Sequence, residues 1–296
     1  MIPQISHKIA QIEQDKVHGA SFISQQALGV MKLAVERSES KNPSEFLAEL
    51  REVGMALKEI RPNMASIANS VSRFIHEVFH EAGKGIMLAD LKSFAYIKGD
   101  EIIQASQQAS LKAAENGAGI LKDKDVVLTS SYSSTVCHAL KIASRQGKLV
   151  RVLALKSRSI DGKSYGEITA HELEMVGITA SAISDASIKH YISVVDKVLV
   201  GADSVFADGF LINGTPTYQL ALAARKNNVP VYAICEIIKF SAQSYQDKEL
   251  HLETGFDIIP PNLITGIVTE RGEVAPEKVI DQVNLCGELP VDIMST

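Results

Sequence analysis

The chain has 296 residues, 46% of them hydrophobic and 22% charged, and its formal net charge is −5 at pH 7. This composition excludes a disordered chain, and the length is enough to bury a core without disulfides or structural metal. The acidic balance argues against a dedicated nucleic-acid-binding protein, because such proteins usually carry a basic excess, so we expect no direct nucleic-acid binding.

The N-terminal part of the chain is predicted to be helical, because good helix formers dominate it and β-branched runs are few. Residues 22–40 show a helical period, and a second helix is expected over residues 44–60, with Ser44 as its cap. Five apolar side chains between residues 67 and 78 fall on one helical stripe. A further long helix is expected over residues 85–116.

After about residue 117 the pattern changes to short apolar runs separated by helical segments. The predicted strands cover residues 126–129, 148–155, 178–184, 197–202, 229–235 and 263–270. Strands that alternate with helices indicate crossover connections and a parallel sheet, and near-continuous apolar runs are typical of strands buried on both faces. We therefore predict an α/β fold, with a helical domain over residues 1–121 and a doubly wound, mainly parallel sheet domain over residues 122–296.

Polar residues follow the predicted strands, at the edge where an open parallel sheet binds its ligands. After the first strand, residues 129–134 read TSSYSS and lead into a helix. Hydroxyls and free amides at a helix N-terminus bind phosphate, although one serine alone could simply cap the helix. Arg158 follows the second strand and is either a bidentate phosphate ligand or a solvated surface charge.

Asp203 directly follows the apolar run of the fourth predicted strand. Partial burial there could raise its pKa for proton transfer, while the alternative is a carboxylate that caps a helix or turn. No G-x-G-x-x-G follows a strand and no P-loop sequence is present, so nicotinamide and P-loop nucleotide binding lose their main support and we expect no cofactor.

Residues 76–80 read HEVFH and match the H-E-x-x-H zinc motif of metalloproteases. Two observations argue against that function. The apolar stripe of residues 67–78 faces away from His76 and His80 on a helix, and the position expected for a third zinc ligand is Ile86. We therefore expect a solvated helix face and no metal site.

The three cysteines lie far apart and form no C-x-x-C pair: Cys137, Cys235 and Cys286. They are expected to be reduced and mostly buried thiols, as is usual in cytosolic proteins. The N-terminus has no apolar signal core, and no segment approaches the roughly 18 apolar residues of a membrane span. We therefore expect a cytoplasmic protein without a membrane partner.

Several segments together carry a resemblance to a known family. The chain resembles the translation initiation factor 2B alpha/beta/delta family, which includes methylthioribose-1-phosphate isomerase and ribose-1,5-bisphosphate isomerase. The most specific segment is VLVGADSVFADGFLINGTPTYQLALAA at residues 198–224, followed by VPVYAICEIIKF and IIPPNLITGIVTERG. The resemblance implies a helical N-terminal domain joined to a Rossmann-like C-terminal domain, through which members form dimers or larger homo-oligomers.

The resemblance also implies the residues that carry the chemistry. The isomerases are thought to use an Asp and a Cys to move protons between C1 and C2 of an opened sugar phosphate. The Asp corresponds to Asp203, but the Cys position is Ser131, whose hydroxyl has a far higher pKa than a thiol, whose pKa is about 8.5. A phosphate-binding arginine is replaced by His18, and a lysine by Gly214. The ligand-binding residues implied here are His18, Arg61, Ser133, Ser134, Arg158 and Asn213.

Two functions are compatible with this pattern. Because Ser131 and Gly214 depart from the isomerases, the main expectation is a regulatory protein like initiation factor 2B that binds a sugar phosphate or nucleotide and is not an efficient isomerase. The alternative is an aldose–ketose isomerase for a ribose-1-phosphate-type substrate, with Asp203 as acid/base and Ser131 or a bound water relaying the proton. In both cases His18 and Arg61 are expected to reach the ligand from the helical domain, across an interdomain cleft.

Overall fold

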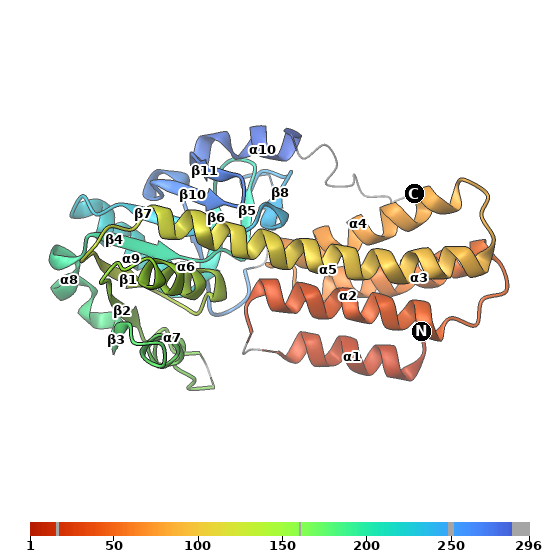
Figure 1. Cartoon of the computed structure of the whole chain (residues 1–296), viewed down its shortest axis with the longest axis horizontal. Coiled ribbons are helices and arrows are strands. Elements are labelled where there is room, and N and C mark those ends of the chain that lie inside the picture. Colours follow the sequence, from red (N-terminus) through yellow and green to blue (C-terminus); the bar gives the residue numbers. More distant parts are fainter. Residues whose placement is uncertain (16–17, 160, 248–251, 286–296) are drawn as a thin grey trace. The chain divides into compact units, whose positions relative to one another are not determined.

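The computed structural model describes residues 1–15, 18–159, 161–247 and 252–285. Within this part of the chain, residues 1–108 and 109–285 form two compact units, and the division falls inside helix α5 (Leu88–Gly119) (Figure 1). The predicted domain boundary after residue 121 lies just beyond the end of α5, and the separate domains themselves stay a prediction.

Helices build the first unit, as the sequence predicts. They are α1 (Pro3–Gln14), α2 (Ala20–Arg37), α3 (Pro43–Glu59) and α4 (Ala65–Ala82), followed by the first part of α5. Helices α2 and α3 both pack against α4, whose apolar stripe is buried as predicted: Ile67, Val71, Phe74, Ile75 and Val78.

The N-terminus of α3 differs from the prediction in one detail. Its cap is Asn42, whose side-chain oxygen accepts a hydrogen bond from the backbone N–H of Glu45 at 3.0 Å, and not Ser44. Because Pro43 occupies the first helical position, where its missing N–H costs nothing, the capping residue is the one before it.

The second unit contains a seven-stranded sheet in the order β11-β10-β7-β4-β1-β2-β3. Its strands are β1 (Val126–Thr129), β2 (Arg151–Leu155), β3 (Thr179–Ile183), β4 (Lys197–Val200), β7 (Val231–Ile234), β10 (Gly266–Thr269) and β11 (Gly272–Val274). Every neighbouring pair is parallel except β10 and β11. The predicted α/β class with a mainly parallel sheet is confirmed.

The helices of the second unit that lie between strands are α6 (Ser134–Arg145), α7 (Tyr165–Glu174), α8 (Ile188–Tyr191) and α9 (Thr217–Lys226), and α10 (Val279–Leu285) follows β11. The end of α5 and the inner faces of α6 and α7 share one apolar core with the sheet, and Cys137 and Leu140 of α6 are completely buried in it. This core fixes where α6 begins, and therefore fixes the turn between β1 and α6.

A second sheet, which the sequence analysis did not predict, has the strand order β8-β5-β6-β9. Its strands are β5 (Ser204–Phe206), β6 (Leu211–Gly214), β8 (Phe240–Ser241) and β9 (Phe256–Ile259). β5 and β8, with three and two residues, are below the length at which hydrophobic alternation becomes recognisable. β5 and β8 pair in parallel, with Val205 opposite Phe240. Lys239, just before β8, therefore lies at the level of Ser204, the neighbour of Asp203.

The order of the large sheet contains a topological switch point between β1 and β4. The chain builds β2 and β3 on one side of β1 and then returns to place β4 on the other side. At such a point the connections leave the sheet in opposite directions, which opens a crevice at the carboxyl ends of the two strands. Residues 130–134 follow β1 and residues 201–203 follow β4, so both segments flank this point.

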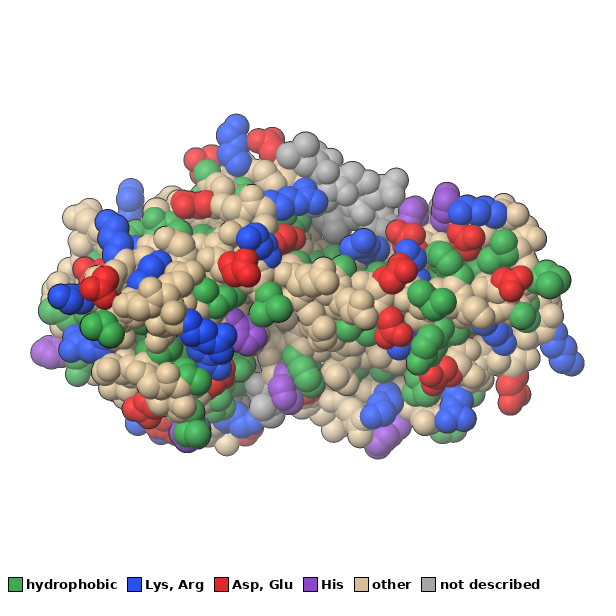
Figure 2. All heavy atoms as spheres, viewed as in Figure 1, with side chains coloured by type: hydrophobic (Ala, Val, Ile, Leu, Met, Phe, Trp, Pro, Cys, Tyr) green, Lys and Arg blue, Asp and Glu red, His purple; other side chains and the backbone are tan. Residues whose placement is uncertain are grey.

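Charged side chains of both signs are interspersed on the face of the molecule shown in Figure 2. This mixture agrees with the nearly balanced count of 30 basic and 35 acidic residues. Among the described residues, no helix is long and apolar enough to cross a membrane.

Candidate functional site

Three side chains of the turn after β1 stabilise the fold. The Ser130 hydroxyl lies 2.7 Å from Thr217 Oγ1 at the start of α9, and Tyr132 donates to a carboxylate oxygen of α7 at 2.9 Å. Ser133 caps α6, because its Oγ accepts a hydrogen bond from a first-turn N–H at 3.3 Å. The simple capping role considered for this turn is therefore real, and Ser133 fulfils it.

The hydroxyls of Ser131 and Ser134 are the two in this turn that make no hydrogen bond within the part of the chain that the structure describes. Ser131 has a positive φ of 61°, and its backbone N–H donates to Ser157 Oγ at 2.8 Å. Ser134 is the first residue of α6, where backbone amides have no partner inside the helix. Both half-buried hydroxyls and these amides can serve an anionic ligand.

Two glycines show how closely this turn approaches β4 and β6. A β-carbon at Gly201 would lie 2.7 Å from Ser133 Oγ and 3.8 Å from Asn213 Oδ1. A β-carbon at Gly214 would overlap Ser131 Oγ and lie 3.0 Å from Ser131 Cβ. The turn after β1, the end of β4 and the end of β6 therefore meet, and no side chain fits at position 214 while Ser131 keeps this conformation.

Asn213 belongs to the same meeting point. It is buried, and its Nδ2 donates to Thr217 Oγ1 at 2.9 Å. Thr217 Oγ1 in turn donates to the carbonyl of Gly214 at 2.6 Å. These bonds hold β6 against the start of α9, and the role of Asn213 toward a ligand stays a prediction.

Asp203 is half-buried after β4, and its backbone N–H donates to the carbonyl of Ile212 at 2.9 Å. Its carboxylate acts electrostatically on two buried residues, Lys239 and Cys235, since it helps to raise the pKa of both. The structure thus places Asp203 beside a buried cation, next to the segments that carry Ser131 and Asn213.

Lys239 and Glu236 are two residues of this region that the sequence analysis missed. Lys239 is only 4% exposed, and its Nζ lies 3.1 Å from Glu236 Oε2. Burial alone would lower the pKa of Lys239, but Glu236, with smaller contributions from Cys235 and Asp203, raises it above 10.5. Lys239 is therefore a fixed ammonium near Asp203. A glutamate and a lysine three residues apart, directly after an apolar strand, were the signal available in the sequence.

The described cysteines are chemically inert. Cys137 and Cys235 are free and buried. Burial raises the pKa of the Cys137 thiol to about 12 and moves the pKa of Cys235 in the same direction. Neither forms a thiolate at neutral pH, so Cys137 does not replace the missing family cysteine. Cys286 lies outside the described residues.

Arg158 lies on the surface, with 53% of its side chain exposed. Its Nη1 donates to the carbonyl of Gly162 at 3.0 Å, and Nη2 lies 3.6 Å from Glu167 Oε1. Lys156 Nζ lies 3.3 Å from the same oxygen. In this structure Arg158 is therefore a solvated surface charge, and binding of phosphate by Arg158 stays a prediction.

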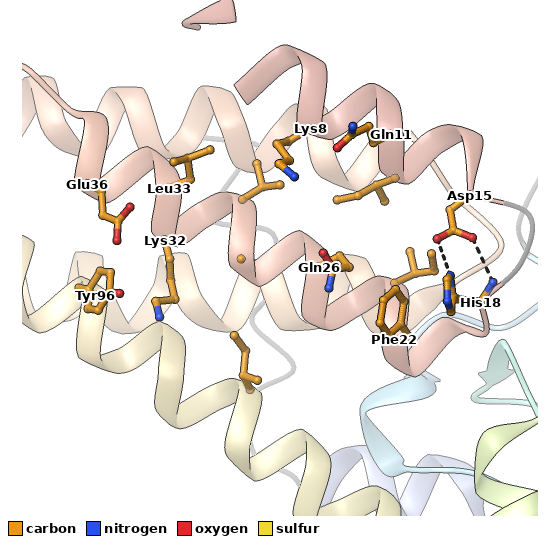
Figure 3. Close-up of a pocket in the computed structure, with 15 residues that line it drawn as sticks. Lys8, Gln11, Asp15, His18, Phe22, Gln26, Lys32, Leu33, Glu36 and Tyr96 are labelled. Atoms are coloured by element: carbon orange, nitrogen blue, oxygen red, sulfur yellow. Dashed lines mark hydrogen bonds and ion pairs between the residues drawn. The ribbon is translucent and has the colours of Figure 1, made fainter. Parts of the chain in front are cut away.

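In the helical unit, Asp15 contacts both predicted ligand-binding residues. His18 Nδ1 lies 2.8 Å from Asp15 Oδ2, and the ring stacks on Phe22 with centroids 4.0 Å apart. Arg61 is buried, and its Nη1 donates to the Asp15 carbonyl at 2.7 Å. Figure 3 shows the Asp15–His18 pair and Phe22 at one end of a cavity of about 590 Å³, which residues of α1, α2 and α5 line.

The H-E-x-x-H segment lies on α4. The ring centroids of His76 and His80 are 6.5 Å apart, and Glu77 Oε2 lies 3.9 Å from Lys98 Nζ. Within the described ranges, no group of three or more His, Cys, Asp or Glu side chains could hold a metal ion. Glu77 is thus part of an ion pair on the helix surface.

Sequence relatives carry two kinds of name. Several, at 26–30% identity, are named ribose 1,5-bisphosphate isomerase, and the one from Thermococcus kodakarensis is 29% identical over 94% of this chain and 92% of its own length. A protein of Pyrococcus furiosus named putative translation initiation factor eIF-2B subunit 2-like is also 29% identical, over 94% of this chain and 99% of its own.

Solved structures share the fold over most of the chain. The translation initiation factor eIF-2B of Pyrococcus horikoshii OT3 has a TM-score of 0.82 at 26% identity, over 95% of this chain and 100% of that one. A chain of the tetrameric eIF2B-beta2-delta2 complex of C. thermophilum has a TM-score of 0.81 at 22% identity, over 95% of this chain and 93% of that one. The latter similarity is one of fold alone.

These comparisons favour one of the two expected functions over the other and confirm the resemblance. The main expectation, a regulatory protein that is not an efficient isomerase, is wrong, because the relatives named ribose 1,5-bisphosphate isomerase favour an isomerase. The family model matches residues 16–255, which is most of the sequence. The chain therefore belongs to the initiation factor 2 subunit family.

Proposed function

We propose that this chain is an aldose–ketose isomerase that acts on a ribose-1-phosphate-type sugar phosphate. The observation that carries the proposal is the half-buried carboxylate of Asp203 at the switch point, near the ammonium of Lys239 and the turn that carries Ser131. The relatives named ribose 1,5-bisphosphate isomerase support the same reaction class.

The reaction moves hydrogen within one molecule. The bond between C1 and the ring oxygen breaks, and the ring oxygen takes a proton to become the C4 hydroxyl. The hydrogen of C2 is transferred to C1, and the C2 hydroxyl loses its proton and becomes the ketone. All atoms and electrons balance without an oxidant or reductant, so two proton-handling groups beside the sugar are enough.

Asp203 is the acid/base group in this proposal. A carboxyl group that is partly withdrawn from water can release and recover a proton near neutral pH, which general acid–base catalysis requires. The ammonium of Lys239 is a fixed positive charge that interacts electrostatically with this carboxylate. Ser131, or a water bound to it, relays the second proton.

The phosphate is proposed to bind at the N-terminus of α6. The dipole of this 12-residue helix and the first-turn amides that Ser133 does not bind favour an anion there, beside the hydroxyl of Ser134 and the capping residue Ser133. Asn213 and Arg158 are proposed to contact the same ligand. His18 and Arg61 are proposed as further phosphate-binding residues on the basis of the family resemblance.

Arg158→Ala is expected to weaken binding of a ribose phosphate by about 1.5–3 kcal/mol, the contribution of a hydrogen bond to a charged group. The expected loss is measured by calorimetric titration. Lys156→Ala is the matched control, because Lys156 pairs with the same Glu167 oxygen and has no proposed contact with the ligand. An unchanged dissociation constant in Arg158→Ala would place the phosphate elsewhere.

We also propose that the protein is a homo-oligomer that assembles through its second unit, in the cytoplasm. The family resemblance, which implies dimers or larger homo-oligomers formed through the C-terminal domain, supports assembly. The two buried, unpaired cysteines support a reducing compartment.

Turnover is tested by incubating the protein with ribose 1,5-bisphosphate, ribose 1-phosphate and methylthioribose 1-phosphate, and recording ¹³C and ³¹P NMR spectra. The expected result is a new C2 carbonyl signal from at least one of them. If none of the three sugar phosphates is converted, the isomerase proposal is contradicted.

Ser131→Cys is expected to raise kcat about tenfold or more. A thiol with a pKa of about 8.5 is partly ionised at neutral pH, while a serine hydroxyl is not, so the thiol is the better proton relay. Ser134→Cys is the matched control and should give no increase; equal rates for wild type and a folded Ser131→Cys would remove Ser131 from the proton path.

A further inference from the structure

We propose that Asp185 is a positioning residue for this reaction, and that it fixes the Ser131 turn through Ser157 without contacting the sugar. The inference rests on the proposed function for its catalytic consequence. It rests on contacts within the second unit for its structural part, so the two can be tested separately.

Two hydrogen bonds link Asp185 to Ser131 through Ser157, and we call this linkage the relay; it transfers no proton. Asp185 Oδ1 accepts the backbone N–H of Ser157 at 3.0 Å, and Ser157 Oγ accepts the backbone N–H of Ser131 at 2.8 Å. Ser131 follows β1, Ser157 follows β2 and Asp185 follows β3, and these three strands are neighbours in the sheet. The relay therefore connects the carboxyl ends of three adjacent parallel strands.

The backbone conformations explain why the relay is needed. Ser131 and Ser157 have φ values of 61° and 43°, in the left-handed region that side-chain-bearing residues rarely adopt. Such conformations persist only where surrounding contacts impose them. The backbone N–H of each of these two residues donates one of the two hydrogen bonds of the relay. The relay is therefore a contact able to impose the positive φ values.

Burial makes the relay hard to replace. Ser157 is only 3% exposed, so water has little access to its N–H or its hydroxyl. A buried N–H without an acceptor is costly, and the backbone would shift to find another partner if Asp185 were removed. Such a shift would change φ at Ser157, move its hydroxyl away from the Ser131 N–H, and reorient the Ser131 side chain that now lies against Gly214.

The test compares three variants and a control in the full-length protein. Asp185→Ala and Ser157→Ala each remove one acceptor of the relay, while Asp185→Asn keeps an oxygen at the same place. Asp196→Ala is the matched control, because Asp196 Oδ2 accepts the N–H of Val126 at 2.8 Å, at the opposite end of β1. Hydrogen exchange of the Ser131 amide is followed by NMR, and kcat and KM are measured with a sugar phosphate.

We expect Asp185→Ala and Ser157→Ala to speed exchange at Ser131 at least tenfold. We expect them to lower kcat by about 10- to 100-fold with a smaller change in KM, since misplacement of a reacting group by about 1 Å has effects of this size. Asp185→Asn should restore both quantities, and Asp196→Ala should leave Ser131 exchange as in wild type. The restored kcat in Asp185→Asn separates positioning from a general loss of stability.

The inference is overturned if exchange at Ser131 is the same in Asp185→Ala as in the wild type, or if kcat is unchanged while exchange rises. Absence of turnover by the wild type is a different outcome. It would contradict the proposed function, and the exchange measurement, which needs no substrate, would still decide whether Asp185 holds the turn.

Discussion

Asp203→Asn is expected to lower kcat for the sugar phosphate by about 10²- to 10⁴-fold, the usual contribution of a general acid–base group. Asparagine has the size and hydrogen-bonding capacity of aspartic acid but cannot take up a proton near neutral pH. The bond between the Asp203 N–H and the Ile212 carbonyl involves only the backbone, so it remains in the variant. Steady-state kinetics together with thermal denaturation measure the effect.

Asp196→Asn is the control for this substitution. It changes an aspartate of the same sheet at the opposite ends of the strands, where it holds the N–H of Val126. We expect its kcat to stay within about twofold of wild type. A folded Asp203→Asn variant that retains a wild-type kcat would show that another group handles the proton.

Lys239→Met is expected to lower the free energy of unfolding by about 3–5 kcal/mol, because removing one partner of a buried ion pair leaves the other charge uncompensated. The Glu236 side chain is 1% exposed and would lose its ammonium partner at 3.1 Å. The double variant Lys239→Met with Glu236→Gln should recover part of the loss, because both charges are then absent. Urea denaturation at neutral pH measures both.

Lys278→Met provides a matched control. Lys278 and Asp281 form an ion pair with the same three-residue spacing, at 3.6 Å, but both side chains are more than half exposed. Exposed pairs contribute little to stability, so a much smaller loss is expected. Equal losses for Lys239→Met and Lys278→Met would mean that burial of the Glu236–Lys239 pair has no energetic consequence.

The buried Glu236–Lys239 pair also predicts how the stability of the protein depends on pH. The pKa of Lys239 in the folded protein is raised above its ordinary value of 10.5, so the ammonium stabilises the fold fully below that pH. The contribution is lost as the pH rises through the higher pKa of the folded state. A urea series from neutral to strongly alkaline pH should show this loss in wild type and not in Lys239→Met.

The sequence was sufficient to place β1, whose observed bounds are the predicted ones, and to identify the parallel sheet. β2 begins three residues later than predicted, at Arg151. The apolar run includes Leu149, but the backbone N–H of Leu149 donates to Asp123 Oδ1 at 2.8 Å and makes no bond to a neighbouring strand. Hydrophobicity alone does not distinguish apolar residues that precede a strand without pairing from the residues of the strand itself.

The parts of the candidate site that follow directly from strand ends could be predicted from the sequence. The parts that depend on which strands pair with one another could not. Ser131 and Asp203 follow strands, so their positions could be inferred from the order of the elements. Lys239 reaches Asp203 only through the pairing of β5 with β8, and Asp185 acts only through hydrogen bonds between the ends of β1, β2 and β3. These contacts join residues distant in the chain.

The wrong functional expectation also has an identifiable source. It gave two replacements, Ser131 and Gly214, more weight than similarity over more than nine-tenths of the chain. The structure relates the two, because Ser131 lies against position 214 and leaves no room for a side chain there. Because the replacements at positions 131 and 214 are coupled, they amount to one change. One change is weaker evidence against catalysis than two independent changes would be.

A crystal structure of the Asp203→Asn variant with ribose 1,5-bisphosphate tests the central claim most directly. The expected result is a sugar phosphate at the switch point, with one phosphate on the first-turn amides of α6 and the side chains of residues 131 and 203 within hydrogen-bond distance of the sugar. A sugar phosphate bound elsewhere, with both side chains turned away from it, would contradict the account.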